Sequence, residues 1–250
     1  MRLSVSRVAR GFLSAGFFAV FALGSLVIGL VAFPVISVFS GKGLAERRRR
    51  SLVRMSYRLF CAAARVTGLF RIEMDERTRR ALKDARACVI AANHISLIDV
   101  VILIATLGDS SAIAKDGAAR NPFYGFIVRS AFIPGGDTAR VLEEASRLLA
   151  AGVNVIVFPE GTRSGAPTPS KKRLKRGAAR IAAASGAKVL PVRLSCSESV
   201  LGKGQPFWDV GERTLVWRLE ASDPIDPSHF PPGRPGEFAL TSVLASQILQ

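Results

Sequence analysis

The hydrophobic positions of this chain follow two patterns. Residues 11–41 contain no charged side chain, and the part from Gly11 to Phe33 is almost wholly apolar. Beyond it, short apolar runs alternate with segments in which apolar residues recur at helical spacing. Strands that alternate with helices are typical of an α/β domain with a mostly parallel sheet. The pattern therefore predicts an apolar N-terminal segment followed by a helix-decorated α/β domain.

The second pattern predicts strands and helices in turn. Its clearest helix covers residues 137–151, where apolar and charged side chains fall on opposite sides. The predicted strands are residues 70–73, 87–92, 111–115, 153–158, 189–194 and 214–220, and the predicted helices are residues 76–84, 97–107, 137–151 and 177–185.

The apolar run is long enough to cross a hydrocarbon core of about 30 Å. It exceeds the roughly 7 to 15 residues of a signal-peptide core and no clear cleavage site follows it, so a cleaved signal is the less favoured alternative. Gly24, Gly29 and Pro34 leave open two short helices that dip into one leaflet and return. We expect residues 1–42 to anchor the protein in the cell membrane, as a helix or a helical hairpin, and residues 43–250 to form the α/β domain.

The formal net charge is +16, from 35 Lys and Arg against 19 Asp and Glu, which suggests an anionic partner. Basic residues gather directly after the apolar segment, at Arg47–Arg50, Arg54 and Arg58. This excess favours a domain on the cytoplasmic face, with the run against anionic membrane phospholipid. A solvated helix face is the plainer alternative. Nucleic acid is disfavoured as a partner, because only Tyr57 offers a stacking ring within the run.

The cysteines indicate neither a disulfide framework nor a zinc site. Cys61, Cys88 and Cys196 are odd in number, far apart and without the spacing of metal ligands. We expect a reducing compartment and no metal.

The first candidate site is Asn93-His94-Ile95-Ser96-Leu97-Ile98-Asp99, directly after the predicted strand 87–92. This places His94 at the carboxyl end of a strand, where open α/β sheets build their sites. A loop before Ser96 lets Asp99 turn back and accept a hydrogen bond from one imidazole nitrogen, which leaves the other nitrogen as a base. The same residues also fit a Ser-x-x-acid helix cap, in which Asp99 only satisfies backbone donors. The spacing by itself leaves both interpretations open.

The second candidate site follows the predicted strand 153–158 and reads Pro159-Glu160-Gly161-Thr162-Arg163-Ser164. Gly161 permits a tight backbone path, and Arg163 offers a planar fork suited to a phosphate. Glu160 either orients Arg163 or receives a substrate hydroxyl. A turn with an incidental ion pair is the plainer interpretation. The basic run Lys171–Arg176 comes next and is either an anion site or a solvated loop.

Together with Leu174-Lys175-Arg176-Gly177 and Val189-Leu190-Pro191-Val192, these stretches resemble the 1-acyl-sn-glycerol-3-phosphate acyltransferase family, over about residues 85–195. The resemblance implies an α/β acyltransferase domain, a mostly parallel sheet decorated by helices, behind an N-terminal membrane element. It implies that the His94/Asp99 pair deprotonates an acceptor hydroxyl, which attacks the thioester of acyl-CoA or acyl carrier protein. It further implies that the acceptor is bound by Glu160, Gly161, Thr162 and Arg163. No metal and no cofactor beyond the donor is implied.

One stretch departs from the family pattern. Where the family usually has an apolar pair followed by Asp-Arg, whose arginine helps to hold the phosphate, this chain has Phe132-Ile133-Pro134-Gly135. Lys115, Arg129 and Arg140 are candidates to replace that arginine, and we include Lys115 among the expected substrate-binding residues. The departure leaves open a lysophospholipid, a lyso-aminolipid or a secondary-metabolite lipid as the acceptor.

We therefore expect a membrane-bound acyltransferase that acylates a lyso-lipid, lysophosphatidic acid or a related lysophospholipid, in phospholipid biosynthesis. Backbone donors at the amino end of helix 97–107 are a candidate oxyanion site. A hydrolase is a rival, but it predicts a Gly-x-Ser-x-Gly elbow that the sequence lacks. A non-enzymatic basic membrane-binding protein is the alternative of another class, and a nucleic-acid binder would show steeply salt-dependent binding.

Overall fold

A computed structural model describes residues 5–161, 174–202 and 204–249 of the protein. Its elements in chain order are α1 (Val5–Val27), the π-helical turn η1 (Ile28–Ala32), α2 (Phe33–Val38), α3 (Lys42–Val66), β1 (Phe70–Glu73), α4 (Glu76–Asp84), β2 (Val89–Ala92), α5 (Asp99–Thr106), β3 (Ser110–Ala114), α6 (Asp116–Ala119), α7 (Gly125–Ala131), β4 (Ile133–Pro134), α8 (Thr138–Ala150), β5 (Asn154–Val157), α9 (Gly177–Ser185), β6 (Val189–Cys196), β7 (Leu215–Ala221), the 3-10 turn η2 (Pro227–His229) and α10 (Arg234–Ile248).

The strands form one sheet in the order β1-β7-β6-β2-β5-β3-β4. Every neighbouring pair is parallel except β6 and β7, which confirms the predicted mostly parallel sheet. Strand β2 lies between β5 and β6. Its side chains alternate between the two cores, Ile90 and Ala92 on one face and Val89 and Ala91 on the other. Because both faces are covered, β2 is a continuous apolar run.

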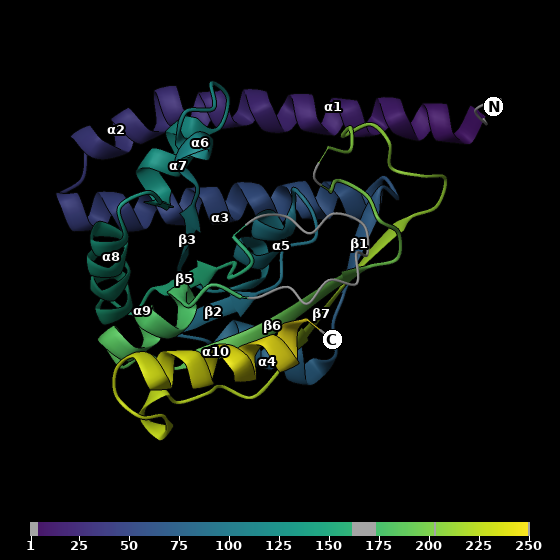
Figure 1. Ribbon diagram of the computed structural model, residues 1–250. Helices are drawn as coiled ribbons and strands as arrows, with labels where there is room; N and C mark the ends of the chain where they lie inside the picture. Colours follow the sequence, from purple (N-terminus) through teal and green to yellow (C-terminus); the bar gives the residue numbers. More distant parts are fainter. Residues whose placement is uncertain (1–4, 162–173, 203, 250) are drawn as a thin grey trace.

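Helices cover the sheet on both sides (Figure 1). Helices α3, α5 and α7 contribute to one core, and α8, α9 and α10 contribute to the other. The N-terminal helix lies outside α3 and forms an additional layer on that side (Figure 1). The carboxyl ends of β2, β5 and β3 point to one edge of the sheet, where parallel α/β sheets place their sites.

The N-terminal apolar segment is one uninterrupted helical stretch from Val5 to Val38, rather than two short helices. It is the one stretch within the described residues that is long and apolar enough to cross a membrane by length and composition. Pro34 does not break the helix. It lies in the first turn of α2, directly after the π-helical turn η1, whose wider hydrogen-bond spacing accommodates a residue without an N–H. Gly29 is buried and lets Phe126 of α7 pack directly against the helix backbone. Gly29 therefore serves packing rather than a bend.

A hairpin does form, but its second arm is the basic helix α3 (Figure 1). Aromatic rings join the two arms. Phe17 meets Phe60 edge to face at 5.6 Å between centroids, and Phe21 stacks on Tyr57 at 5.7 Å. The long apolar helix is thus packed along a helix that belongs to the α/β domain.

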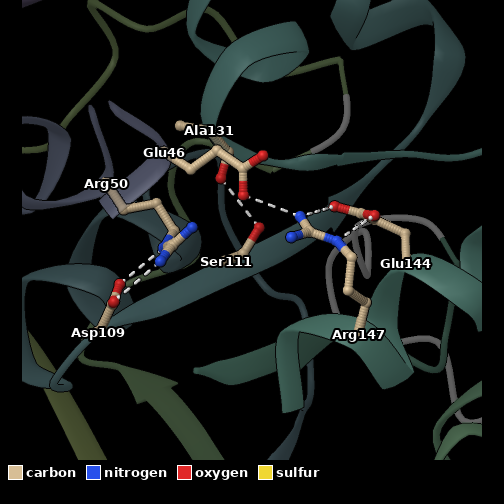
Figure 2. Close-up of polar contacts among 7 residues, drawn as sticks. All are labelled: Glu46, Arg50, Asp109, Ser111, Ala131, Glu144 and Arg147. Carbon is tan, nitrogen blue, oxygen red and sulfur yellow. Dashed lines mark hydrogen bonds and ion pairs between the residues drawn. The ribbon is translucent and has the colours of Figure 1, made fainter. Parts of the chain in front are cut away.

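Ion pairs hold α3 to the rest of the α/β domain (Figure 2). Arg50 binds both carboxylate oxygens of Asp109, at 2.7 and 3.0 Å. Arg147 of α8 binds Glu46 at 2.9 Å and also its neighbour Glu144. The Arg50 side chain is only 10% exposed. Part of the basic run is therefore structural, while Arg47, Arg48 and Arg58 are among its exposed members.

The predicted elements are present, most with ends shifted by one or two residues. Helices 76–84 and 177–185 and strand 70–73 have the predicted bounds, and helix 97–107 is shorter, at Asp99–Thr106. Helix α10 is absent from the prediction. Its signals are Pro235 in the first turn and the buried residues Leu240, Leu244 and Ile248 at four-residue intervals.

Candidate active site

The loop between β2 and α5 carries His94 and is fixed at its start by Asn93. The side-chain amide of Asn93 donates to the carbonyl of Leu194 at 2.8 Å and accepts from the Leu194 N–H at 2.6 Å. These two bonds continue the pairing of β2 with β6 for one residue beyond the strand. The amide is buried, so both of its hydrogen bonds form within the protein. His94 therefore leaves the sheet edge from a fixed position.

His94 and Asp99 form the predicted pair. The Nδ1 of His94 lies 2.9 Å from Oδ2 of Asp99. A carboxylate only accepts, so Nδ1 carries the proton and Nε2 keeps a free lone pair. The Asp99 side chain is fully buried, while the imidazole is 21% exposed. The pair thus combines a partly exposed imidazole with a buried carboxylate that orients it.

Asp99 also accepts donors of the turn before α5, so the bond to the imidazole and the bond to the turn occur together. Its carboxylate accepts the Ser96 N–H at 2.7 Å and a short hydrogen bond from the Ser96 hydroxyl. Together with Nδ1 of His94, these donors compensate the burial of the carboxylate. The sequence indicated only a capping role for Ser96, and its hydroxyl bond to Asp99 was not predicted. Here it fixes the group that orients His94.

Glu160 joins the two motifs. Its Oε1 accepts the backbone N–H of His94 at 2.8 Å, across 66 residues of sequence. The ring of Phe158, one residue beyond β5, stacks on the imidazole at 4.3 Å between centroids. Neither contact was predicted, because each depends on β5 lying beside β2. The imidazole is therefore held by Asp99 on its edge and by Phe158 on its face.

Gly161 lies beside a lysine at the same edge. Its φ of +68° is readily adopted by glycine, and a Cβ there would meet Cε and Nζ of Lys175 at 2.9 Å. The Lys175 N–H donates to the carbonyl of Pro159 at 2.8 Å. The motif containing Lys175 is thus brought against the one containing Glu160. The predicted substrate-binding residues Thr162 and Arg163 lie outside the described residues. Residues 171–173 of the basic run also lie outside them.

Lys115 directly follows β3, two strands from β2, and its side chain is exposed. With strands about 4.8 Å apart, it lies roughly 10 Å from the His94 loop along the edge. Beside it, a Cβ at Gly135 would meet the carbonyl oxygen of Ala114 at 2.8 Å. The backbone where the family has an arginine is therefore too close to β3 for any side chain without movement.

The other cations considered as replacements have different contacts. Arg129 donates a short hydrogen bond to the carbonyl of Ala119, and its guanidinium lies 4.8 Å from the ring of Phe126. Arg140 lies on the exposed side of α8. Of the three, Lys115 is the residue beside Gly135 at the carboxyl edge of the sheet.

Two of the backbone donors before α5 are already engaged. The Ser96 N–H binds Asp99, and the Leu97 N–H donates to the carbonyl of Leu201 at 3.0 Å. These two amides therefore do not form the oxyanion site expected there.

The thiols are held in their neutral form. Burial raises the pKa of Cys196, which follows the sheet edge near Asp99, and nearby carboxylates add to this effect. Burial also raises the pKa of Cys88, and that of Cys61 to about 12. A neutral thiol is a poor nucleophile. Within the described ranges, no group of three His, Cys, Asp or Glu side chains is arranged to hold a metal ion.

Known proteins are similar to this chain in sequence and in architecture. The acyltransferase family matches residues 70–195. A 1-acyl-sn-glycerol-3-phosphate acyltransferase of Chlamydomonas reinhardtii is 26% identical over 72% of this chain and 55% of its own length. A lyso-ornithine lipid O-acyltransferase of Rhizobium meliloti is 28% identical over 56% of this chain and 46% of its own length. The chain thus spans about half the length of these curated relatives.

The crystal structure of the 1-acyl-sn-glycerophosphate acyltransferase PlsC from Thermotoga maritima has a similar fold. It aligns with a TM-score of 0.68 over 96% of this chain and 95% of its own, at 23% identity. That likeness concerns the fold, whereas the family match covers the strands and loops that carry His94, Asp99 and Glu160. The chain belongs to the acyltransferase family.

Proposed function

We propose that the protein transfers a fatty acyl group from the thioester of acyl-CoA or acyl carrier protein to the hydroxyl of a membrane lyso-lipid. Lysophosphatidic acid or a related lysophospholipid is the proposed acceptor, in phospholipid biosynthesis. The observation that carries the proposal is the His94–Asp99 pair, with Nδ1 bonded at 2.9 Å and the imidazole reaching the surface. Such a pair activates a hydroxyl without an enzyme nucleophile.

In the proposed reaction, Nε2 of His94 takes the hydroxyl proton as the acceptor oxygen attacks the thioester carbonyl. The tetrahedral intermediate collapses and the carbon–sulfur bond breaks. The imidazolium then returns the proton to the leaving thiolate, so the products are an ester and a free thiol. Asp99 stabilises the imidazolium and maintains the tautomer.

The acceptor's anionic group is proposed to lie along the edge from Gly161 to Lys115. Lys175 lies against Gly161, and Lys115 lies beside Gly135. We propose both as cationic partners, together with Arg163, which is outside the described residues. Amines and guanidinium groups recognise phosphate oxygens through charge-assisted hydrogen bonds.

A lyso-aminolipid acceptor is the second candidate. Two observations favour it. The backbone at Gly135 excludes a side chain where the family has an arginine, and one of the relatives is named a lyso-ornithine lipid O-acyltransferase. With no arginine at Gly135, the site would bind a phosphate monoester less tightly. It would suit a larger head group that carries less negative charge.

We further propose that the N-terminal helix lies along the membrane surface with the catalytic domain on the cytoplasmic side. Its outward side carries exposed apolar side chains, among them Phe12 at 77%, Val20 at 70% and Val38 at 77%. A transmembrane orientation would take the neighbouring α3, with exposed Arg47 and Arg58, toward the hydrocarbon, at about 2.5 to 3.5 kcal/mol for each arginine at the centre. An interfacial orientation avoids that cost.

The test is product analysis by mass spectrometry. Purified protein in lipid vesicles receives acyl-CoA or acyl carrier protein thioester with a panel of lyso-lipids, beside the His94→Ala variant. We expect a new ester that requires an acceptor and that His94→Ala does not form. Free fatty acid released without acceptor would indicate a hydrolase. Ester formation that survives His94→Ala would refute the assigned base.

A further inference from the structure

The loop between β6 and β7 connects the active-site edge to the N-terminal helix. It leaves β6 at Cys196, and the carbonyl of Leu201 accepts the Leu97 N–H next to the catalytic pair. Its later part runs beside the N-terminal half of α1 (Figure 1). There the Ser14 hydroxyl donates to the carbonyl of Phe207 at 2.5 Å, and the rings of Phe18 and Phe207 lie 5.1 Å apart. The loop is thus attached at the active site and at the helix.

Two aromatic residues occupy the tip of a tight turn in this loop. The Asp209 N–H donates to the carbonyl of Pro206 at 3.2 Å, which makes Phe207 and Trp208 the central residues of the turn. Such positions usually hold Gly, Asn, Asp or Ser. Here Phe207 is 38% and Trp208 is 54% exposed. The Trp208 ring meets the Phe207 ring edge to face at 4.8 Å between centroids, yet about half of its surface stays exposed.

The exposed aromatic surface continues onto α1. The Trp208 carbonyl is so near Gly11 that a Cβ there would lie 3.1 Å away. Phe12, the next residue of the helix, is 77% exposed, and Val8, one turn earlier, is 42% exposed. Phe12 points about 100° around the helix from Gly11, with Val8 between them, so the turn lies on the flank of the exposed apolar side. An ion pair of Arg7 with Asp209, at 2.7 Å, borders this surface.

We propose that the turn at Phe207 and Trp208 is an aromatic anchor that inserts into the lipid bilayer at the membrane–water interface beside α1. Tryptophan suits this place because its ring is apolar and its N–H remains hydrated at head-group level. Since the same loop binds Leu97, the anchor sets the height of the His94 loop relative to the bilayer. The inference rests on the proposed membrane association and adds a second contact element outside the N-terminal helix.

The two tryptophans of the chain make a direct test possible. Trp217 is fully buried in the core, whereas Trp208 is half exposed. Trp217→Phe leaves Trp208 as the sole reporter, and Trp208→Phe leaves Trp217. Each variant is reconstituted in phosphatidylcholine–phosphatidylglycerol vesicles whose acyl chains carry bromine near the head group or near the chain end. We expect fluorescence of the Trp208 reporter to be quenched, more by bromine near the head group, and that of the Trp217 reporter to be unchanged.

A binding measurement uses a matched control on the opposite side of the protein. Phe238 of α10 is 57% exposed and lies on the other side of the sheet from α1 (Figure 1). We expect Trp208→Ala to weaken partition into the same vesicles about tenfold, which is about 1.4 kcal/mol. Phe238→Ala removes a similar exposed aromatic side chain and should leave partition unchanged.

The outcomes separate the anchor from membrane association itself. If the unsubstituted protein sediments with vesicles but Trp208 is not quenched, the anchor is refuted and membrane association stands. If the protein does not sediment with vesicles, both are refuted. Equal losses of partition for Trp208→Ala and Phe238→Ala would also overturn the anchor, because they would show an effect of aromatic loss anywhere on the surface.

Discussion

The carboxylate of Glu160 accepts the backbone N–H of His94 at 2.8 Å, so the acidic residue of one motif holds the base of the other. This contact fixes the loop after β2 against the loop after β5. It gives Glu160 a positioning role that does not depend on which acceptor is bound. His94, the proposed base, is therefore positioned by three different segments: its own loop, the loop after β5, and β6 through Asn93.

Replacing Glu160 separates this positioning role from substrate binding. Glu160→Gln keeps an oxygen that accepts the His94 N–H, while Glu160→Ala leaves that donor without its partner. We expect Ala to lower the free energy of unfolding by about 1 to 3 kcal/mol and Gln to lower it much less. Thermal unfolding of the two variants measures this difference. Equal destabilisation by Gln and Ala would contradict the assigned contact.

Asp99→Asn changes the hydrogen-bonding character of the group below His94 with little change in size. An amide no longer stabilises the imidazolium and can present a donor to Nδ1. We expect kcat to fall roughly 100- to 10,000-fold with a smaller change in KM, by analogy with other oriented histidine bases. Steady-state kinetics measure both.

Ser96→Ala is the matched control for that variant. It removes one hydroxyl donor from the Asp99 carboxylate but keeps the His94–Asp99 bond. A loss of about tenfold in kcat is expected, because one charge-assisted hydrogen bond is removed from a positioning residue. If Ser96→Ala lowered kcat as much as Asp99→Asn, the larger effect of Asp99 expected from its direct contact with His94 would be contradicted.

Replacing the two adjacent cations of one motif should affect different properties, substrate binding for Lys175 and stability for Arg176. Lys175 lies against Gly161 at the site edge, whereas Arg176 binds Glu237 of α10 at 3.0 Å. We expect Lys175→Ala to raise the KM of an anionic acceptor about tenfold or more, with the KM of the thioester donor unchanged. Arg176→Met should lower the melting temperature and leave the acceptor KM nearly unchanged. An unchanged acceptor KM in Lys175→Ala would exclude this lysine from the acceptor site.

The Arg147–Glu144 pair predicts a pH dependence of stability. The hydrogen bond from Arg147 lowers the pKa of Glu144, so the pair stabilises the folded state above the unfolded pKa and loses this effect as pH falls through the folded pKa. We expect Arg147→Met to cost about 1 kcal/mol at pH 7, since both side chains are partly exposed. Once the pH is below the lowered pKa of Glu144, the variant and the unsubstituted protein should differ little.

Thermal unfolding across that pH range measures the difference. Arg77→Met is the control, because its partner Asp223 is 87% exposed and the pair should contribute almost nothing. A constant difference between Arg147→Met and the unsubstituted protein at all pH values would assign the loss to packing instead of charge.

Local sequence determined most strands, four of the helices and the His94–Asp99 pair. The apolar run of β2, the helical spacing of residues 137–151 and the loop before Ser96 each depend on neighbours within a few positions. His94 and Asp99 are five positions apart, so one turn of chain brings them together. Helix α10 shows the same kind of signal in Leu240, Leu244 and Ile248, and could have been predicted from it.

Only the tertiary structure decided what joins these pieces. Sheet order places β5 beside β2, which brings Glu160 and Phe158 to His94, and the backbone bond from Lys175 to Pro159 holds Lys175 at Gly161. The close approach of Gly135 to Ala114 likewise depends on the pairing of β3 with β4. Such contacts join residues that are distant in sequence, and the hydrophobic pattern records only that a segment is buried, not which segment lies against it.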